Sequence, residues 1–147
     1  MDDHIITTEH DADFLVWTSE QIELLRAKQF DRLDLENIIE ELESMARAER
    51  REFKHRIEQL IMHLLKCKLQ PDHISGSWLG TIFEQRRSIT DLLLEMPSLK
   101  PQLDSYIART YATAVEHASR ETHLPKSAFP ATMPFTNDQL LDPDYLP

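Results

Sequence analysis

The chain has few of the residues that build the common catalytic and cofactor-binding motifs. Its 147 residues include two glycines, Gly76 and Gly80, which match neither a phosphate-cradling loop nor a dinucleotide fingerprint. Its single cysteine, Cys67, excludes an internal disulfide framework and a thiolate-rich metal cage. We therefore expect no bound cofactor and no metal site of this kind, and the composition by itself points to no specific reaction.

Long apolar runs are also absent. The most apolar stretch, LIMHLLKCKL, is interrupted by His63, Lys66 and Lys68, so it is not expected to span a membrane. The first residues, MDDHIITTEHD, are acidic and unlike a secretory signal. Together these features predict a cytoplasmic protein.

The acidic net charge of −10 is distributed unevenly along the chain. Residues 1–45 contain thirteen acidic and three basic residues, whereas residues 46–100 contain ten basic and seven acidic residues. The acidic first third would repel phosphate backbones, which makes nucleic acid an unlikely partner. The basic run between Arg50 and Arg56 is interpreted as a solvated helix face, with contact to an acidic partner as the alternative.

Helical periodicity dominates the sequence, with segments predicted at residues 11–28, 35–69, 78–96 and 99–123. The second segment contains no Pro or Gly and would be roughly 50 Å long, which exceeds the size of a compact domain of this length. We expect it to bend near residues 44–50 or to project and pack on another subunit.

The C-terminal segment, residues 124–147, holds five of the eight prolines. The sequence TNDQ predicts one short helical turn there by a capping box. The tail also contains Phe129, Phe135 and Leu140, so we expect it to pack back on the helices. The fold prediction is a single all-α domain over residues 1–147, a bundle of about four main helices with this tail folded against it.

One short motif suggests metal binding at first sight. In EFKH, Glu52 and His55 have the Glu-x-x-His spacing of carboxylate-bridged di-iron bundles. Such a site needs a second copy of the motif and two further inward glutamates, and the chain has no second copy. His55 also points away from the apolar side of its helix, so no metal site is predicted.

Several charged residues do fall on apolar helix faces. With about 100° of rotation per residue, Glu49 and Arg86 lie within the apolar stripes of their segments, as does Glu121. Buried charges are costly unless they are paired. We therefore predict a buried or half-buried polar cluster in which Glu49 meets Arg86, with Glu121 or Arg56 as further members and His63 at its border. It is interpreted either as a structural ion pair or as a ligand-binding or catalytic pocket.

Larger stretches of the chain resemble a known family. The run DFLVWTSEQIELLRAKQFDRLDLENIIEELESMARAERREF, together with LIMHLLKCKLQP, SWLGTIFEQRRSI and the final QLLDPDYLP, is similar to a bacterial family catalogued as domain of unknown function number twenty-nine. The resemblance covers nearly the whole chain and implies an all-helical fold, and it brings no established activity, substrate or cofactor. Members of the family usually have Gly at the position of Ala46, Trp at that of Cys67 and Gly at that of His123.

Two functional hypotheses follow. The first is a non-enzymatic helical protein-interaction or regulatory module that binds a protein partner or itself, suggested by the long second segment and the uneven charge. The alternative is a small-ligand-binding or catalytic bundle that uses the cluster of Glu49, His63, Arg86 and Glu121.

Overall fold

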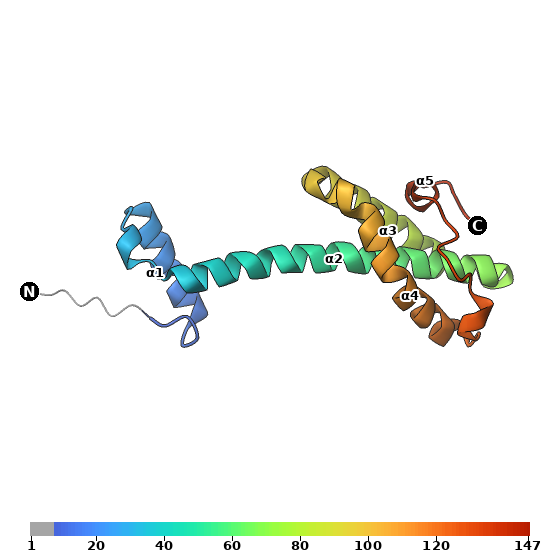
Figure 1. Cartoon of the computed structure of the whole chain (residues 1–147), viewed down its shortest axis with the longest axis horizontal. Helices are drawn as coiled ribbons and strands as arrows, with labels where there is room; N and C mark the ends of the chain where they lie inside the picture. Colours follow the sequence, from blue (N-terminus) through green and yellow to red (C-terminus); the bar gives the residue numbers. More distant parts are fainter. Residues whose placement is uncertain (1–7) are drawn as a thin grey trace, which may run out of the picture. The chain divides into compact units, whose positions relative to one another are not determined.

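The computed structural model describes residues 8–147 and shows an all-α protein, as predicted, with no strand in this part of the chain (Figure 1). Residues 1–7, which include most of the acidic start that we compared with a secretory signal, lie outside the described residues. The α-helices are α1 (Phe14–Arg26), α2 (Leu35–Leu69), α3 (Gly76–Glu95), α4 (Leu103–Thr122) and α5 (Asn137–Leu141). Short 3₁₀ turns η1 (Phe30–Arg32), η2 (Pro71–His73), η3 (Pro97–Gln102) and η4 (Lys126–Ala128) connect them.

The long second helix has the predicted bounds, and the fourth begins later than predicted. We expected helix from residue 99, but residues Pro97–Gln102 form the 3₁₀ turn η3 and α4 starts at Leu103. Pro101 explains the difference, because proline has no N–H to donate and disfavours the α conformation of the residue before it.

Residue contacts divide the chain into two compact units with the boundary between Ala48 and Glu49. We call residues up to Ala48 the N-terminal unit and residues from Glu49 the C-terminal unit. The boundary falls within residues 44–50, near which a bend of the long helix was one of the two expectations.

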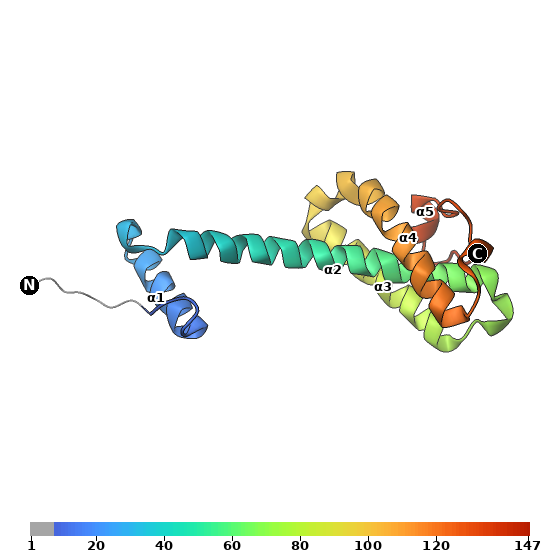
Figure 2. The same cartoon turned by 60° about the horizontal axis from the view of Figure 1, so that its bottom comes forward.

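The C-terminal unit contains the main hydrophobic core. In both views α3 and α4 lie against the second half of α2 (Figures 1 and 2), and the ring of Phe53 packs edge-on against Tyr106 at 5.2 Å. Phe53, Ile61, Leu64 and Ile89 have no exposed surface. Burying such side chains stabilises a fold by about 1.5–3 kcal/mol each.

The C-terminal tail packs on this core, as predicted. Phe129, Phe135 and Leu140 are buried, and the Tyr111 hydroxyl donates a hydrogen bond to the Pro130 carbonyl. The predicted capping box is present, with the Thr136 side chain accepting from the backbone N–H of Gln139. It starts the short helix α5, which carries Leu140 into the core.

Within residues 8–147, the non-glycine residues with a left-handed backbone conformation are Lys28, with φ 56°, and His123, with φ 60°. Lys28 follows α1, and the Gln29 N–H reaches back to the Leu24 carbonyl, which is the hydrogen bond of a Schellman motif. His123 ends α4 in the same conformation. Only glycine adopts this conformation without steric cost.

None of the helices described here combines the length and the apolar character that crossing a bilayer requires.

Candidate interaction surface and polar clusters

The structure does not bring Glu49 and Arg86 together, and the predicted contact between them is wrong. Glu49 is exposed on α2. Arg86 on α3 is only 4% exposed, as its position on the apolar stripe predicted, but its partners are backbone oxygens of the tail. Its Nε donates to the Leu140 carbonyl at 2.8 Å and its Nη2 to the Gln139 carbonyl at 3.0 Å.

Arg86 therefore acts as a clamp on the tail. The last carbonyls of a helix have no partner within it, and Gln139 and Leu140 belong to the final turn of α5. The guanidinium supplies two donors in a fixed geometry that fits both oxygens. Burial lowers the pKa of Arg86, an effect opposed by the nearby Asp142 and Tyr145.

Glu121 has a different partner from those that we considered. Its Oε2 accepts from Lys66 Nζ at 2.6 Å, and this Nζ also lies 4.4 Å from the centre of the Trp78 ring. The Lys66 side chain is 7% exposed, whereas that of Glu121 is half exposed. The ion pair and the cation–π contact together compensate for burying the ammonium group. Our sequence reasoning missed Lys66, although a lysine inside a mostly apolar stretch is a signal of this arrangement.

His63 is buried one turn before Lys66 on α2. Its Nδ1 donates to the Gln59 carbonyl at 2.8 Å. Burial is the main effect that lowers the pKa of His63, and the charge of Lys66 adds to it, so the ring is neutral near pH 7. Burial likewise raises the pKa of the neighbouring Cys67 thiol, which keeps it protonated.

Glu49, His63 and Arg86 do not converge on one hollow. Arg86 lines a surface hollow with Phe83 and Leu141, whereas Glu49 lines another with Arg56 and Asp91. The geometry that a shared ligand pocket would need is therefore not formed. Within residues 8–147 no group of three or more His, Cys, Asp or Glu side chains could hold a metal ion.

The N-terminal unit is held together largely by polar contacts. Trp17 Nε1 on α1 donates to Asp34 Oδ2 at 3.0 Å, and the Gln21 side chain accepts from the Asp34 N–H at 2.9 Å. His10 Nε2 lies 2.6 Å from Glu41 Oε1 on α2. The hydrogen bonds to Glu41 and Asp11 raise the pKa of His10. These contacts fix α1 to the first turns of α2.

Most large apolar side chains of this unit remain exposed. Leu35, Ile39, Leu42 and Met45, which we call the α2 apolar face, are 57%, 53%, 60% and 64% exposed. Their spacing places them on one side of the helix. On α1 and η1 the exposed apolar side chains are Phe14, Leu15, Val16, Ile22, Leu25 and Phe30. Only Trp17 and Leu24 are buried apolar residues in the described part of this unit.

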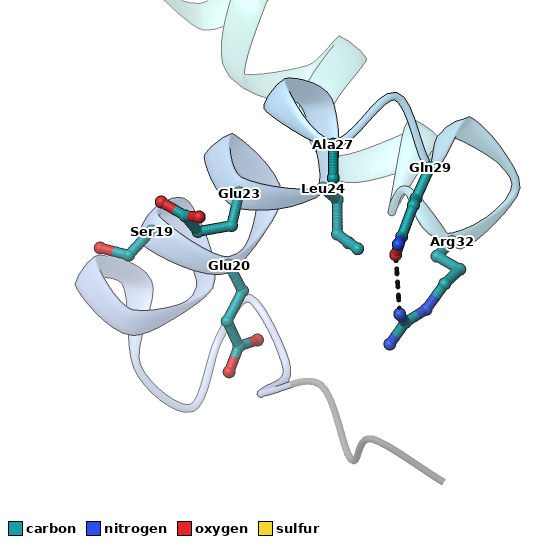
Figure 3. Close-up of a pocket in the computed structure, with 7 residues that line it drawn as sticks. All are labelled: Ser19, Glu20, Glu23, Leu24, Ala27, Gln29 and Arg32. Atoms are coloured by element: carbon teal, nitrogen blue, oxygen red, sulfur yellow. Dashed lines mark hydrogen bonds between the residues drawn. The ribbon is translucent and has the colours of Figure 1, made fainter. Parts of the chain in front are cut away.

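A hollow of about 470 Å³ lies on the same unit, between α1 and the residues that follow it (Figure 3). Leu24 and Ala27 line it, Glu20 and Glu23 stand on one side, and Arg32 is held by a hydrogen bond to Gln29 on the other. Both Glu20 oxygens already accept hydrogen bonds from Thr8. The hollow thus offers apolar contact area with a charged rim, as a protein-binding surface does.

Comparisons with curated proteins and with solved structures gave no match. The family comparison did: the model of the domain of unknown function DUF29 matches residues 10–146. Because this match covers nearly the whole chain, the chain belongs to the DUF29 family.

Proposed function

We propose that this chain is a non-enzymatic helical module that binds another protein through its N-terminal unit. The observation that carries the proposal is the set of ten large apolar side chains between Phe14 and Met45 that are each more than 40% exposed. So many exposed large apolar side chains in one small unit are unusual on a protein that acts alone, and apolar surface of this kind marks interaction sites.

The physical driving force is the removal of this surface from water. Burial contributes roughly 25 cal/mol for each Å² of apolar surface, so covering the four side chains of the α2 apolar face supplies several kcal/mol. Their spacing of three and four residues suits a helix that packs into a groove or against another helix. A partner would bury the apolar surface that the small core of the N-terminal unit leaves exposed.

The arrangement of polar residues does not favour the ligand-binding alternative. Arg86 Nε and Nη2 donate to tail carbonyls, Glu49 faces solvent, and the His63 ring donates to its own helix.

Site-specific photo-crosslinking tests the proposal. A photoreactive phenylalanine analogue replaces Leu42 in one variant and Leu94 on α3 in the other, where the exposed fraction of the leucine is a comparable 68%. We expect a discrete protein adduct from position 42 in cells, whose yield falls when Met45 is changed to Glu, and none from position 94. Equal adducts at both positions, or an adduct at 42 that Met45→Glu leaves unchanged, would overturn the proposal.

A further inference from the structure

We propose that the partner of the α2 apolar face is a second copy of this chain, with the two α2 helices paired antiparallel. This inference rests on the proposed function and names its partner. Charge complementarity is the observation that selects this partner, and it does so through the order of acidic and basic residues along α2.

The charges of α2 change sign along its length. Residues 36–43 contain Glu36, Glu40, Glu41 and Glu43 and no basic residue, and the basic residues begin at Arg47. Further along, Arg50, Arg51 and Lys54 are exposed and take part in no ion pair within residues 8–147. One helix thus presents an acidic segment and, about two turns later, unneutralised basic side chains.

The two kinds of charge also lie on the same flank of the apolar face. At about 100° of rotation per residue, Glu36, Glu43 and Arg50 all lie roughly 80–120° from the direction of Leu42. In an antiparallel pair of helices each flank faces the same flank of the partner helix, so acidic and basic segments meet. In a parallel pair the acidic segments would lie side by side and repel.

An overlap centred on residue 44 combines apolar contacts with a charge pair on each side of the axis. It places Leu42 of each copy opposite Ala46 of the other, and Glu36 of each copy within about 3 Å along the axis of the level of Arg50 of the other. The two Met45 side chains and the two Glu43 side chains lie beside their counterparts, and each Glu43 keeps its ion pair with Arg47 of its own chain at 3.7 Å. A two-fold axis forms each contact twice, as in most homodimers. The exposed Glu49 then faces Ile39 of the second copy, which is unfavourable and keeps the association reversible.

Sedimentation equilibrium across a concentration series tests self-association. We expect the wild type to dimerise, Leu42→Glu to raise the dissociation constant by roughly tenfold or more because a charge would enter the apolar contact, and Leu94→Glu to leave it unchanged. Glu49→Leu should lower the dissociation constant by roughly tenfold, because it extends the apolar contact. A monomeric wild type, or equal effects at positions 42 and 94, would overturn the inference.

Cysteine crosslinking tests the orientation. In the antiparallel pair Met45→Cys crosslinks to its counterpart, whereas the two Leu35→Cys residues are about 27 Å apart along the helix axes and do not. The buried Cys67 stays in place, and the wild type serves as the control. Crosslinking at both positions would indicate a parallel pair and contradict the proposal.

A charge exchange adds an independent test. Glu36→Lys and Arg50→Glu should each weaken the dimer, and the double variant should restore it, because the exchanged charges meet again across the axis. Additive weakening in the double variant would contradict the pairing. If the wild type is monomeric and the adduct at position 42 contains a different protein, self-association fails and the proposed function stands. If no specific adduct forms either, both fail.

Discussion

The two units of this protein use similar amphipathic helices in opposite ways. In the C-terminal unit the apolar residues of α2, such as Phe53 and Leu64, are completely buried by α3, α4 and the tail. In the N-terminal unit the corresponding residues, such as Leu42 and Met45, are about 60% exposed. One half of the helix stabilises the fold, and the other half keeps its apolar surface available.

The polar groups differ in the same way. The C-terminal unit buries Lys66 and Arg86 and gives each of them protein partners. The N-terminal unit relies on hydrogen bonds near its surface, including those of Trp17 and His10. The comparison indicates that stability is concentrated in the C-terminal unit, and four measurements test this difference, from the largest expected effect to the smallest.

Truncating a core aromatic should destabilise the C-terminal unit most. We expect Phe53→Ala to lower the free energy of unfolding by about 3–5 kcal/mol, because it leaves a cavity in a fully buried site. Met45→Ala on the N-terminal unit should change it by less than about 0.5 kcal/mol in dilute protein. Urea denaturation of both variants gives the comparison, and a similar loss in the two would show that the α2 apolar face is covered even in dilute solution.

Arg86→Met should release the tail. The substitution removes two charge-assisted hydrogen bonds and leaves the Gln139 and Leu140 carbonyls without these donors, so we expect a loss of about 2–4 kcal/mol. Hydrogen exchange of the amides of residues 135–147 should accelerate in parallel. The neighbouring Arg87→Met changes an exposed side chain and serves as the control. An unchanged melting temperature for Arg86→Met would show that the clamp does not contribute to folding.

The pH dependence should differ between the units. Carboxylate partners raise the pKa of His10, so its contribution to stability is complete below the unfolded value of about 6.5 and is lost as the pH rises through the raised pKa. Burial lowers the pKa of His63, so the C-terminal unit loses stability as the pH falls below about 6.5. Acidification from pH 8 to 5 therefore favours the N-terminal contact and disfavours the core.

Histidine titration by NMR measures both effects. We expect the His10 pKa above the unfolded value and the His63 pKa below it. Glu41→Gln should lower the pKa of His10 and leave that of His63 unchanged. If the pKa values of His10 and His63 were both above or both below the unfolded pKa, the expected difference between the two units would be contradicted.

Glycine at the left-handed positions should have the smallest effect. His123→Gly removes the steric cost of φ 60° and should stabilise the C-terminal unit by up to about 1 kcal/mol. Lys28→Gly should do the same at the end of α1. His123→Ala keeps the cost and provides the control. A lower melting temperature for His123→Gly than for His123→Ala would contradict the steric argument, because neither variant keeps the histidine side chain.

The sequence by itself determined the helical segments and several local features of them. The bounds of α2, the burial of Arg86 and the capping box at Thr136 all follow from spacing along the chain, because helical rotation and capping are local properties. The family assignment likewise depends only on the order of residues.

Only the tertiary structure decided which groups meet. A helical wheel shows that Arg86 points inward, but it gives no information about which backbone oxygens of a distant tail will face it. In the same way, the apolar stripe of α2 reads continuously from Leu35 to Leu64, and nothing in its pattern separates the buried half from the exposed half. Whether a stripe is covered depends on where the other helices pack, and that is set by contacts between residues far apart in the sequence.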